Sequence, residues 1–221
     1  MEQTTQRQTA AASASLSRLV YYFTKRLIDI IGSAVLLVVL SPLMLAVALA
    51  IWLDSGLPIL YRCERLGRFG EPITVLKFRT MRDGSHGHLE ELLTNDEERR
   101  LQYDLTRKLR EDPRRTRIGV FLRRASLDEL PQLANVLFGQ MSLIGPRPYF
   151  VDELRGRPEA TEVLSVRPGI TGLWQVNGRS DVSFEDRLAL ETAYVQQRGF
   201  GLDLSIAART FGAVLSGRGA Y

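Results

Sequence analysis

A long apolar segment lies near the start of the chain. No charged residue occurs from Ile30 to Leu53, a run of 24 residues. A straight helix of that length would cross a hydrocarbon core of roughly 30 Å at about 1.5 Å per residue. Pro42 falls near the centre of the run and breaks or kinks a helix, while the Ser41 hydroxyl can satisfy a carbonyl that is freed. The pattern predicts two helices with a break at Ser41 and Pro42.

Two membrane geometries are compatible with such a break. The segment can span with a kink, or it can enter and return on the same side. Positive residues flank it on both sides: Arg18, Lys25 and Arg26 before it, and Arg62, Arg65 and Arg68 after it. Because positive residues collect on the cytoplasmic side of membranes, we favour the re-entrant geometry with both ends cytoplasmic.

The stretch "KRLID" precedes the apolar run. Lys25 and Arg26 lie four and three residues before Asp29, on a shared face of a helix. A carboxylate near lipid is costly, and an ion pair lowers that cost. The spacing therefore predicts an ion pair between Asp29 and these cations at the membrane entrance.

The polar body of the chain begins with strand-like stretches. Residues 58–64 and 72–79 read as two strands of a hairpin, joined through Gly67 and Gly70. The spacing of leucines predicts a helix over 88–110. Two more helices are expected over about 183–198 and 203–216.

The last of these helices is amphipathic. One face can lie on the domain core or on a membrane surface, and we favour the core. That face carries Leu204, Ala207, Ala208, Phe211 and Leu215.

These elements predict an α+β, mostly helical fold. A mobile tail is expected over residues 1–17, which are rich in Thr, Gln, Ala and Ser. A re-entrant membrane helix–break–helix is expected over 18–56, followed over 57–221 by a small domain with a short β-hairpin on the cytosolic face.

The charge of the chain indicates which kinds of partner it binds, and its cysteine content excludes a disulfide within the chain. The net charge is +4 and the pI about 9.4, which favours anionic partners such as nucleic acid, anionic lipid or phosphorylated substrates. Residues 107–124 alone hold eight Arg or Lys against two acids. Cys63 is the single cysteine, so no disulfide forms within the chain.

Two adjacent carboxylates follow this basic stretch in "SLDELPQL". Ser126 and Glu129 match a helix capping box, with Asp128 in the first turn. Capping alone does not explain the arginines around them, Arg123 before the pair and Arg147 after it. Arginine fits phosphate oxygens in a bidentate way, so the pattern also fits a site where a phosphoryl group meets a nucleophile or a metal ion.

Other polar positions leave two interpretations open. Lys77 and Arg79 lie two residues apart on one side of a strand, where a solvated edge is the simpler explanation. Trp174 and Arg179 stand in the glycine-rich stretch "RPGITGLWQVNGR", where they can hold a nucleobase and a phosphate or only contribute to packing.

Together these motifs resemble a known family. "KRLID", the Ser-Pro break, "KFRTM", "SLDELPQL", "GPRP" and "RPGITGLWQVNGR" occur in this order from about Lys25 to the end. The chain resembles the bacterial sugar transferases, which are monotopic phosphoglycosyl transferases, and is most similar to members that initiate exopolysaccharide synthesis.

The resemblance implies an activity. Sugar-1-phosphate would pass from a UDP-sugar, UDP-glucose or UDP-galactose, to undecaprenyl phosphate with release of UMP, at the cytoplasmic face of the bacterial inner membrane. Expected partners are the UDP-sugar, polyprenyl phosphate and membrane lipid, with no nucleic acid. The rival functions are a glycosyltransferase that releases UDP, and a non-catalytic membrane adaptor or nucleic-acid binder.

The resemblance also implies residue roles. Asp128 would be the nucleophile that forms a covalent phosphosugar intermediate, and a ligand of Mg²⁺. Glu129 would orient or deprotonate a group in the second step. The implied contacts to substrate phosphates or nucleotide are Arg123, Arg147, Lys77, Arg79 and Arg179.

Overall fold

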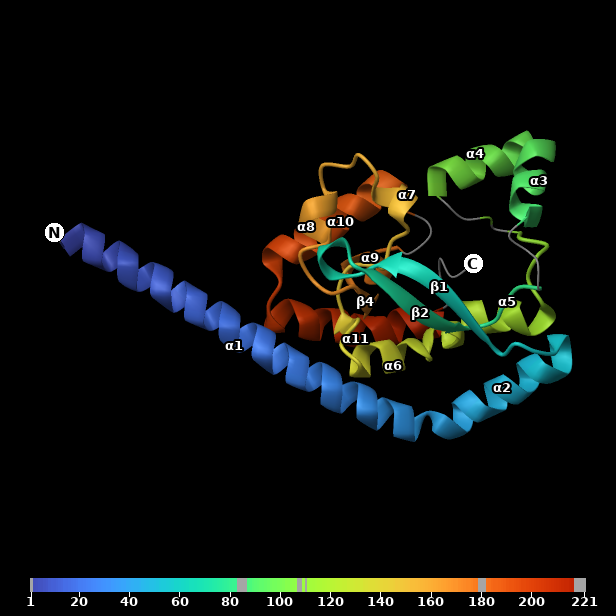
Figure 1. Ribbon diagram of the computed structural model, residues 1–221, viewed down its shortest axis with the longest axis horizontal. Helices are drawn as coiled ribbons and strands as arrows, with labels where there is room; N and C mark the ends of the chain where they lie inside the picture. The colour runs from blue at the N-terminus through green and yellow to red at the C-terminus, as the bar shows by residue number, and fades with distance from the viewer. Residues whose placement is uncertain (1, 83–86, 107–108, 110, 179–181, 217–221) are drawn as a thin grey trace.

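The apolar segment folds as two helices in the computed structural model. α1 (Glu2–Val39) and α2 (Ser41–Ser55) are separated by one residue and bent by 60° (Figure 1). Pro42 has no N–H to donate to the carbonyl of Val38, and the Ser41 hydroxyl donates to that oxygen instead at 2.8 Å. The predicted break at Ser41 and Pro42 is confirmed.

The structure describes residues 2–82, 87–106, 109, 111–178 and 182–216. Within these ranges no single helix is long and apolar enough to cross a membrane, but Ser17–Val39 and Ser41–Ser55 meet the length and composition requirement as a bent pair. Residues 2–17, which the composition predicts as an irregular tail, are drawn as the first part of α1.

The predicted hairpin is present. β1 (Leu60–Leu66) and β2 (Pro72–Phe78) are antiparallel, with Leu60 opposite Phe78 and Leu66 opposite Pro72. A second pair, β3 (Ser142–Ile144) and β4 (Gly169–Thr171), is parallel. The second pair was not predicted, because three residues are too few for an alternating pattern to be recognised.

Two helices replace the one predicted over 88–110. α3 (Gly87–Asn95) and α4 (Glu97–Thr106) are separated at Asp96, whose carboxylate caps α4 by accepting the N–H of Arg99 at 3.0 Å. The remaining helices are α5 (Arg117–Arg124), α6 (Gln132–Leu137), α7 (Val151–Leu154), α8 (Ala160–Val163), α9 (Leu173–Val176), α10 (Phe184–Gln197) and α11 (Phe200–Ser216).

One buried cluster joins the apolar helices to the polar body. Val47 and Ile51 of α2 pack with Phe78 of β2 and Leu122 of α5. The strand that carries Lys77 is therefore fixed directly to the second helix of the bent pair.

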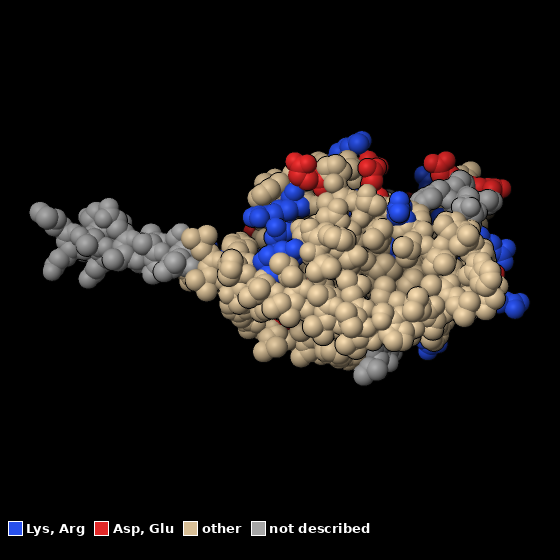
Figure 2. Space-filling model, turned by 60° about the horizontal axis from the view of Figure 1, so that its bottom comes forward, with Lys and Arg blue, Asp and Glu red and all other residues tan. Residues whose placement is uncertain are grey.

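A broad apolar surface runs along one side of the molecule. The surface turned forward in Figure 2 is almost wholly free of charged side chains, which lie mainly along the upper edge and at the right-hand end of the view. Beyond α1 and α2, exposed Phe121 and Phe138 contribute to the apolar surface of the molecule. Leu204 and Phe211 of α11 are 73% and 74% exposed, so the preference for core packing of that helix face was wrong. α11 instead contributes Ile206 to the core, where this side chain packs against Tyr194 and Val195.

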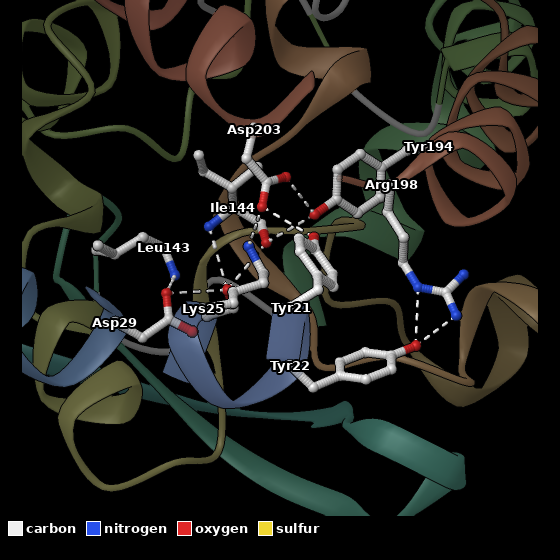
Figure 3. A network of polar contacts seen from close by, with 10 residues as sticks. Tyr21, Tyr22, Lys25, Asp29, Leu143, Ile144, Tyr194, Arg198 and Asp203 are labelled. Carbon is white, nitrogen blue, oxygen red and sulfur yellow. Dashed lines mark hydrogen bonds and ion pairs between the residues drawn. The ribbon is translucent and has the colours of Figure 1, made fainter. Parts of the chain in front are cut away.

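Asp203, near the start of α11, joins α1 to α10. Its Oδ2 accepts hydrogen bonds from the Tyr21 hydroxyl at 2.9 Å and from Lys25 Nζ at 2.8 Å, and its Oδ1 accepts from the Tyr194 hydroxyl at 2.9 Å (Figure 3). All three donors lie at least nine residues away in sequence. This buried carboxylate holds α1 on the body of the protein.

The predicted ion pair of Asp29 is wrong. Lys25 pairs with Asp203, and Arg26 donates to two carbonyl oxygens at the end of α6. The Asp29 carboxylate accepts hydrogen bonds from the N–H of Leu143 at 2.9 Å and from the hydroxyl of Ser142 at 3.1 Å. Asp29 therefore binds residues of β3, more than 100 positions away in sequence, instead of the cations one turn earlier in α1, because its carboxylate is buried against β3.

We expect Asp203→Asn to destabilise the protein. The change leaves the partly buried Lys25 ammonium without its carboxylate, which costs about 2–4 kcal/mol, or roughly 5–15 °C in Tm for a chain of this size. Thermal unfolding in detergent measures the effect. Asp152→Asn is the matched control, because Asp152 is 84% exposed at its side chain and should leave Tm unchanged. Equal Tm values for the two variants would disprove the anchoring role.

Candidate active site

Asp128 and Glu129 lie on η2 (Leu127–Glu129), a short 3₁₀ helix between α5 and α6. Ser126 precedes it in the left-handed region, with φ of 56°, and its hydroxyl makes no capping hydrogen bond. The Glu129 carboxylate instead accepts from Lys77 Nζ of β2 at 2.7 Å. The capping-box interpretation is therefore wrong, and Glu129 is directed across the site toward β2.

Asp128 is a desolvated carboxylate. Its exposed fraction is 9%, and burial raises its pKa to about 6, with the negative charge of Glu129 adding to the rise. The positive charges of Lys77 and Arg123 oppose this shift. Such a group is ionised at neutral pH but weakly solvated, which suits a nucleophile.

Arg123 reaches the site from the last turn of α5. Its Nε donates to Thr80 Oγ1 at 3.0 Å, just after the end of β2. The helix and the strand end approach so closely that a Cβ on Gly119 would lie 2.1 Å from the Thr80 carbonyl oxygen. Gly119 is thus needed to position Arg123, a role that the sequence did not reveal because it depends on a tertiary contact.

Arg79, for which the resemblance implied a contact with substrate phosphate, instead binds backbone carbonyl groups. It is buried, and its guanidinium donates to the carbonyl oxygens of Ser55, Gly56 and Leu57 at 2.6–2.9 Å. These are the carbonyls at the C-terminal end of α2, where a cation is favoured by the helix dipole. Arg79 therefore ties the apolar helix to the end of β2.

Arg147 belongs to a second cluster. Its backbone N–H donates to Glu191 of α10 at 3.0 Å, and its guanidinium lies 5.6 Å from the centre of the Trp174 ring. Burial raises the pKa of Glu191 to about 8, against the opposing effects of that hydrogen bond and of Arg187. Among the described residues, no hydrogen bond or ion pair joins Arg147 to Asp128.

Two further positions were considered as nucleotide contacts. Trp174 is buried and its ring lies 4.3 Å from the Arg187 guanidinium, so packing is the interpretation that the structure favours. Arg187 and Glu191 were missed, because nothing in their helical spacing distinguishes them from surface residues. Arg179 lies outside the described residues.

The structure therefore brings four of the predicted residues together: Lys77, Arg123, Asp128 and Glu129. In the described part of the chain there is no group of three or more His, Cys, Asp or Glu side chains that could hold a metal by themselves. Two adjacent carboxylates flanked by a lysine and an arginine can attract a phosphoryl group and attack it.

Comparison with known proteins agrees with these motifs. The family model described as "Bacterial sugar transferase" matches residues 20–217. A Salmonella typhimurium protein named undecaprenyl-phosphate galactose phosphotransferase is 44% identical over 90% of this chain and 42% of its own length. The exopolysaccharide production protein ExoY of Sinorhizobium fredii is 43% identical over 90% of this chain and 88% of its own.

A third relative carries a different sugar in its name. The UDP-glucose:undecaprenyl-phosphate glucose-1-phosphate transferase of Caulobacter vibrioides is 38% identical over 98% of this chain and 79% of its own length. The chain spans less than half the length of several relatives, including the Salmonella protein. The match over residues 20–217 confirms the resemblance read from the motifs, and the chain belongs to the bacterial sugar transferase family.

Proposed function

We propose that this protein transfers sugar-1-phosphate from a UDP-sugar to undecaprenyl phosphate and releases UMP, as the first membrane step of exopolysaccharide synthesis. The observation that carries the proposal is the buried Asp128 carboxylate of η2, which feels the positive charges of Lys77 and Arg123. Lys77 lies on β2, which packs against the apolar helix α2. The names of the relatives support the choice of donor and acceptor.

The reaction proceeds in two displacements at one phosphorus. An Asp128 carboxylate oxygen attacks the phosphorus that bears the sugar, and the bond from that phosphorus to the oxygen of UMP breaks. The product is a covalent aspartyl-phosphosugar. An oxygen of polyprenyl phosphate then attacks the same phosphorus and releases the Asp128 carboxylate. Dividing the transfer in this way replaces one difficult step with two easier ones.

The cationic side chains act on the charge of the phosphoryl oxygens. Lys77 and Arg123 lower the cost of bringing an anionic diphosphate to an anionic nucleophile. Glu129 holds the Lys77 ammonium at 2.7 Å and is placed to orient or deprotonate a group in the second step. Arg147 is proposed to contact a phosphate of the donor, and Arg179, which lies outside the described residues, to contact a phosphate or the nucleotide.

The donor set at Asp128 fits Mg²⁺. Lys77 is bound to Glu129, which leaves the Asp128 carboxylate oxygens as hard anionic ligands. Proteins commonly hold Mg²⁺ with one or two carboxylates together with substrate phosphates and water, so a third protein ligand is not required. When bound, the ion would neutralise charge on the diphosphate.

The bent pair of helices is proposed to enter the bacterial inner membrane and return, with the catalytic domain on the cytoplasmic face. Its apolar side chains are exposed, and the uncharged surface continues onto the body of the molecule (Figure 2). A monotopic arrangement places Asp128 where a soluble nucleotide-sugar and a lipid head group can meet.

The rate should depend on the ionisation of Asp128. Its pKa is raised to about 6, so the nucleophile is ionised above this value and protonated below it. We expect kcat/KM for the UDP-sugar to be level above pH 7 and to fall about tenfold per pH unit below the pKa. A profile without an acid limb near pH 6 would argue against Asp128 as the attacking group.

Product analysis tests the proposal. The purified protein in detergent is mixed with Mg²⁺, undecaprenyl phosphate and either UDP-glucose or UDP-galactose, the two sugars that the relatives' names suggest. UMP released only in the presence of the lipid is the expected result and identifies the sugar. UDP would instead indicate transfer of the sugar alone, and release of neither nucleotide would favour a non-catalytic adaptor.

A further inference from the structure

A basic pocket lies beside α1 and shares no residue with the cluster around Asp128. Its volume of about 40 Å³ exceeds the roughly 10–15 Å³ that a single water needs. Five cationic side chains line it, and Figure 3 shows two of them, Arg198 next to Tyr22 and Lys25 next to Asp203. The cations are Lys25, Arg26, Arg68, Arg167 and Arg198, and the only acid in the lining is Asp29.

Neutral groups hold most of these cations in place, the exception being Lys25, which is paired with Asp203. Arg26 donates to two carbonyl oxygens of α6, at 2.7 and 3.0 Å. Arg68 Nε donates to the Ser165 carbonyl at 3.0 Å, and Arg167 Nε donates to the Gly139 carbonyl at 2.8 Å. Carbonyl oxygens fix the guanidinium groups without cancelling their charge. Arg68 and Arg167 both line the pocket, and these hydrogen bonds use Nε rather than the terminal nitrogens.

The positive charges in the pocket repel one another. The pKa of Arg167 is lowered, first by burial and then by the charges of Arg26 and Arg68. The negative charge of Asp29 counters this only in part. An anion placed among the guanidinium groups would relieve the repulsion and accept several charge-assisted hydrogen bonds.

The pocket lies at the border of the apolar surface. Its α1 wall covers residues 21–29, and the uncharged run begins at the next residue, Ile30. On another side, Gly139 accepts the Arg167 hydrogen bond and follows Phe138, which is 79% exposed. An exposed aromatic residue and the start of the apolar run both indicate the depth of lipid head groups.

We propose that this pocket binds the phosphate group of a membrane phospholipid. The bound head group would fix the depth and the tilt of α1 and thereby the height of the body above the bilayer. The inference rests on the proposed membrane placement of α1 and α2, and not on the chemistry proposed at Asp128.

Lipid-dependent stabilisation tests this site. The full chain in a non-ionic detergent is titrated separately with phosphatidylglycerol, with diacylglycerol of the same chains, with undecaprenyl phosphate and with inorganic phosphate. We expect phosphatidylglycerol to raise Tm by about 5 °C or more at saturation, and diacylglycerol to have little effect. If inorganic phosphate alone reproduces the full rise, the pocket is a site for a soluble anion and the lipid assignment is wrong.

Two matched double variants separate the pocket from general charge attraction. Arg68→Gln/Arg167→Gln should lose most of the phosphatidylglycerol-dependent rise, whereas Arg99→Gln/Arg155→Gln, which removes the same charge from α4 and from the exposed end of α7, should keep it. Each rise is measured against the variant's own lipid-free Tm, so a general loss of stability does not mimic the result.

Two further results would overturn the proposal. Equal rises in the two double variants would mean that the pocket does not hold the lipid. A rise with undecaprenyl phosphate but none with phosphatidylglycerol would assign the pocket to the acceptor substrate. Because no UDP-sugar is present, failure here leaves the release of UMP, and with it the proposed function, to be judged separately.

Discussion

Asp128→Asn should abolish sugar-1-phosphate transfer, with a loss of at least roughly 1,000-fold in kcat, because an amide cannot form the phosphosugar intermediate. Asparagine has nearly the same size, so the packing of η2 should survive. Initial rates of UMP release with a fixed UDP-sugar measure the loss. Sedimentation with membranes should remain as in the unaltered protein, since the change leaves the exposed apolar side chains of α1 and α2 intact.

The stability of this variant provides an independent check. Burial raises the pKa of Asp128 to about 6, so the charged form destabilises the folded state above that pH. Removing the charge should leave Tm at pH 8 equal or higher. The difference should shrink as the pH falls through about 6, where the carboxyl becomes protonated in the folded protein. Retention of a tenth of the activity or more would exclude Asp128 as the nucleophile.

Lys77→Met should have the next largest effect, a loss of about 100-fold or more in kcat. Methionine keeps the length of the side chain but removes the ammonium that binds Glu129 at 2.7 Å and lowers the pKa of Asp128. The acid limb of the pH profile should therefore move above pH 6, toward neutral. Initial rates between pH 5 and 9 measure both changes.

Lys77→Arg is the matched control for this prediction. It restores the positive charge with a different shape, so the acid limb should return toward its original position even if the rate recovers only in part. A lower rate with an unmoved acid limb in Lys77→Met would show that the lysine does not act on the charge of Asp128.

Several features of this protein follow from its sequence alone. The break at Ser41 and Pro42 was predictable, because proline lacks a donor and the serine beside it supplies one. The hairpin was predictable from two strand-like runs joined through Gly67 and Gly70. The adjacent carboxylates Asp128 and Glu129, which follow a basic stretch, indicated where the site lies. Residues that are neighbours in sequence remain close in any fold.

Partner choice for charged side chains was decided by the tertiary structure. Neighbouring positions predicted that Asp29 binds Lys25 and that Glu129 caps a helix, and the family resemblance implied that Arg79 meets phosphate. In the fold, Asp29 binds β3, Glu129 binds Lys77, and Arg79 binds the end of α2. Each of these partners lies more than 20 residues away in sequence.

The physical reason lies in the cost of desolvation. A charge that becomes buried must find partners among whatever groups the packing of distant elements brings near it, and a local partner is replaced when a distant one is better placed. The sequence by itself determined the helical break, the hairpin and the adjacency of the two carboxylates, because these depend on neighbouring residues. Only the packing of α1, α2 and α5 against the two small sheets decided which cations face Asp128 and which fix the apolar helices.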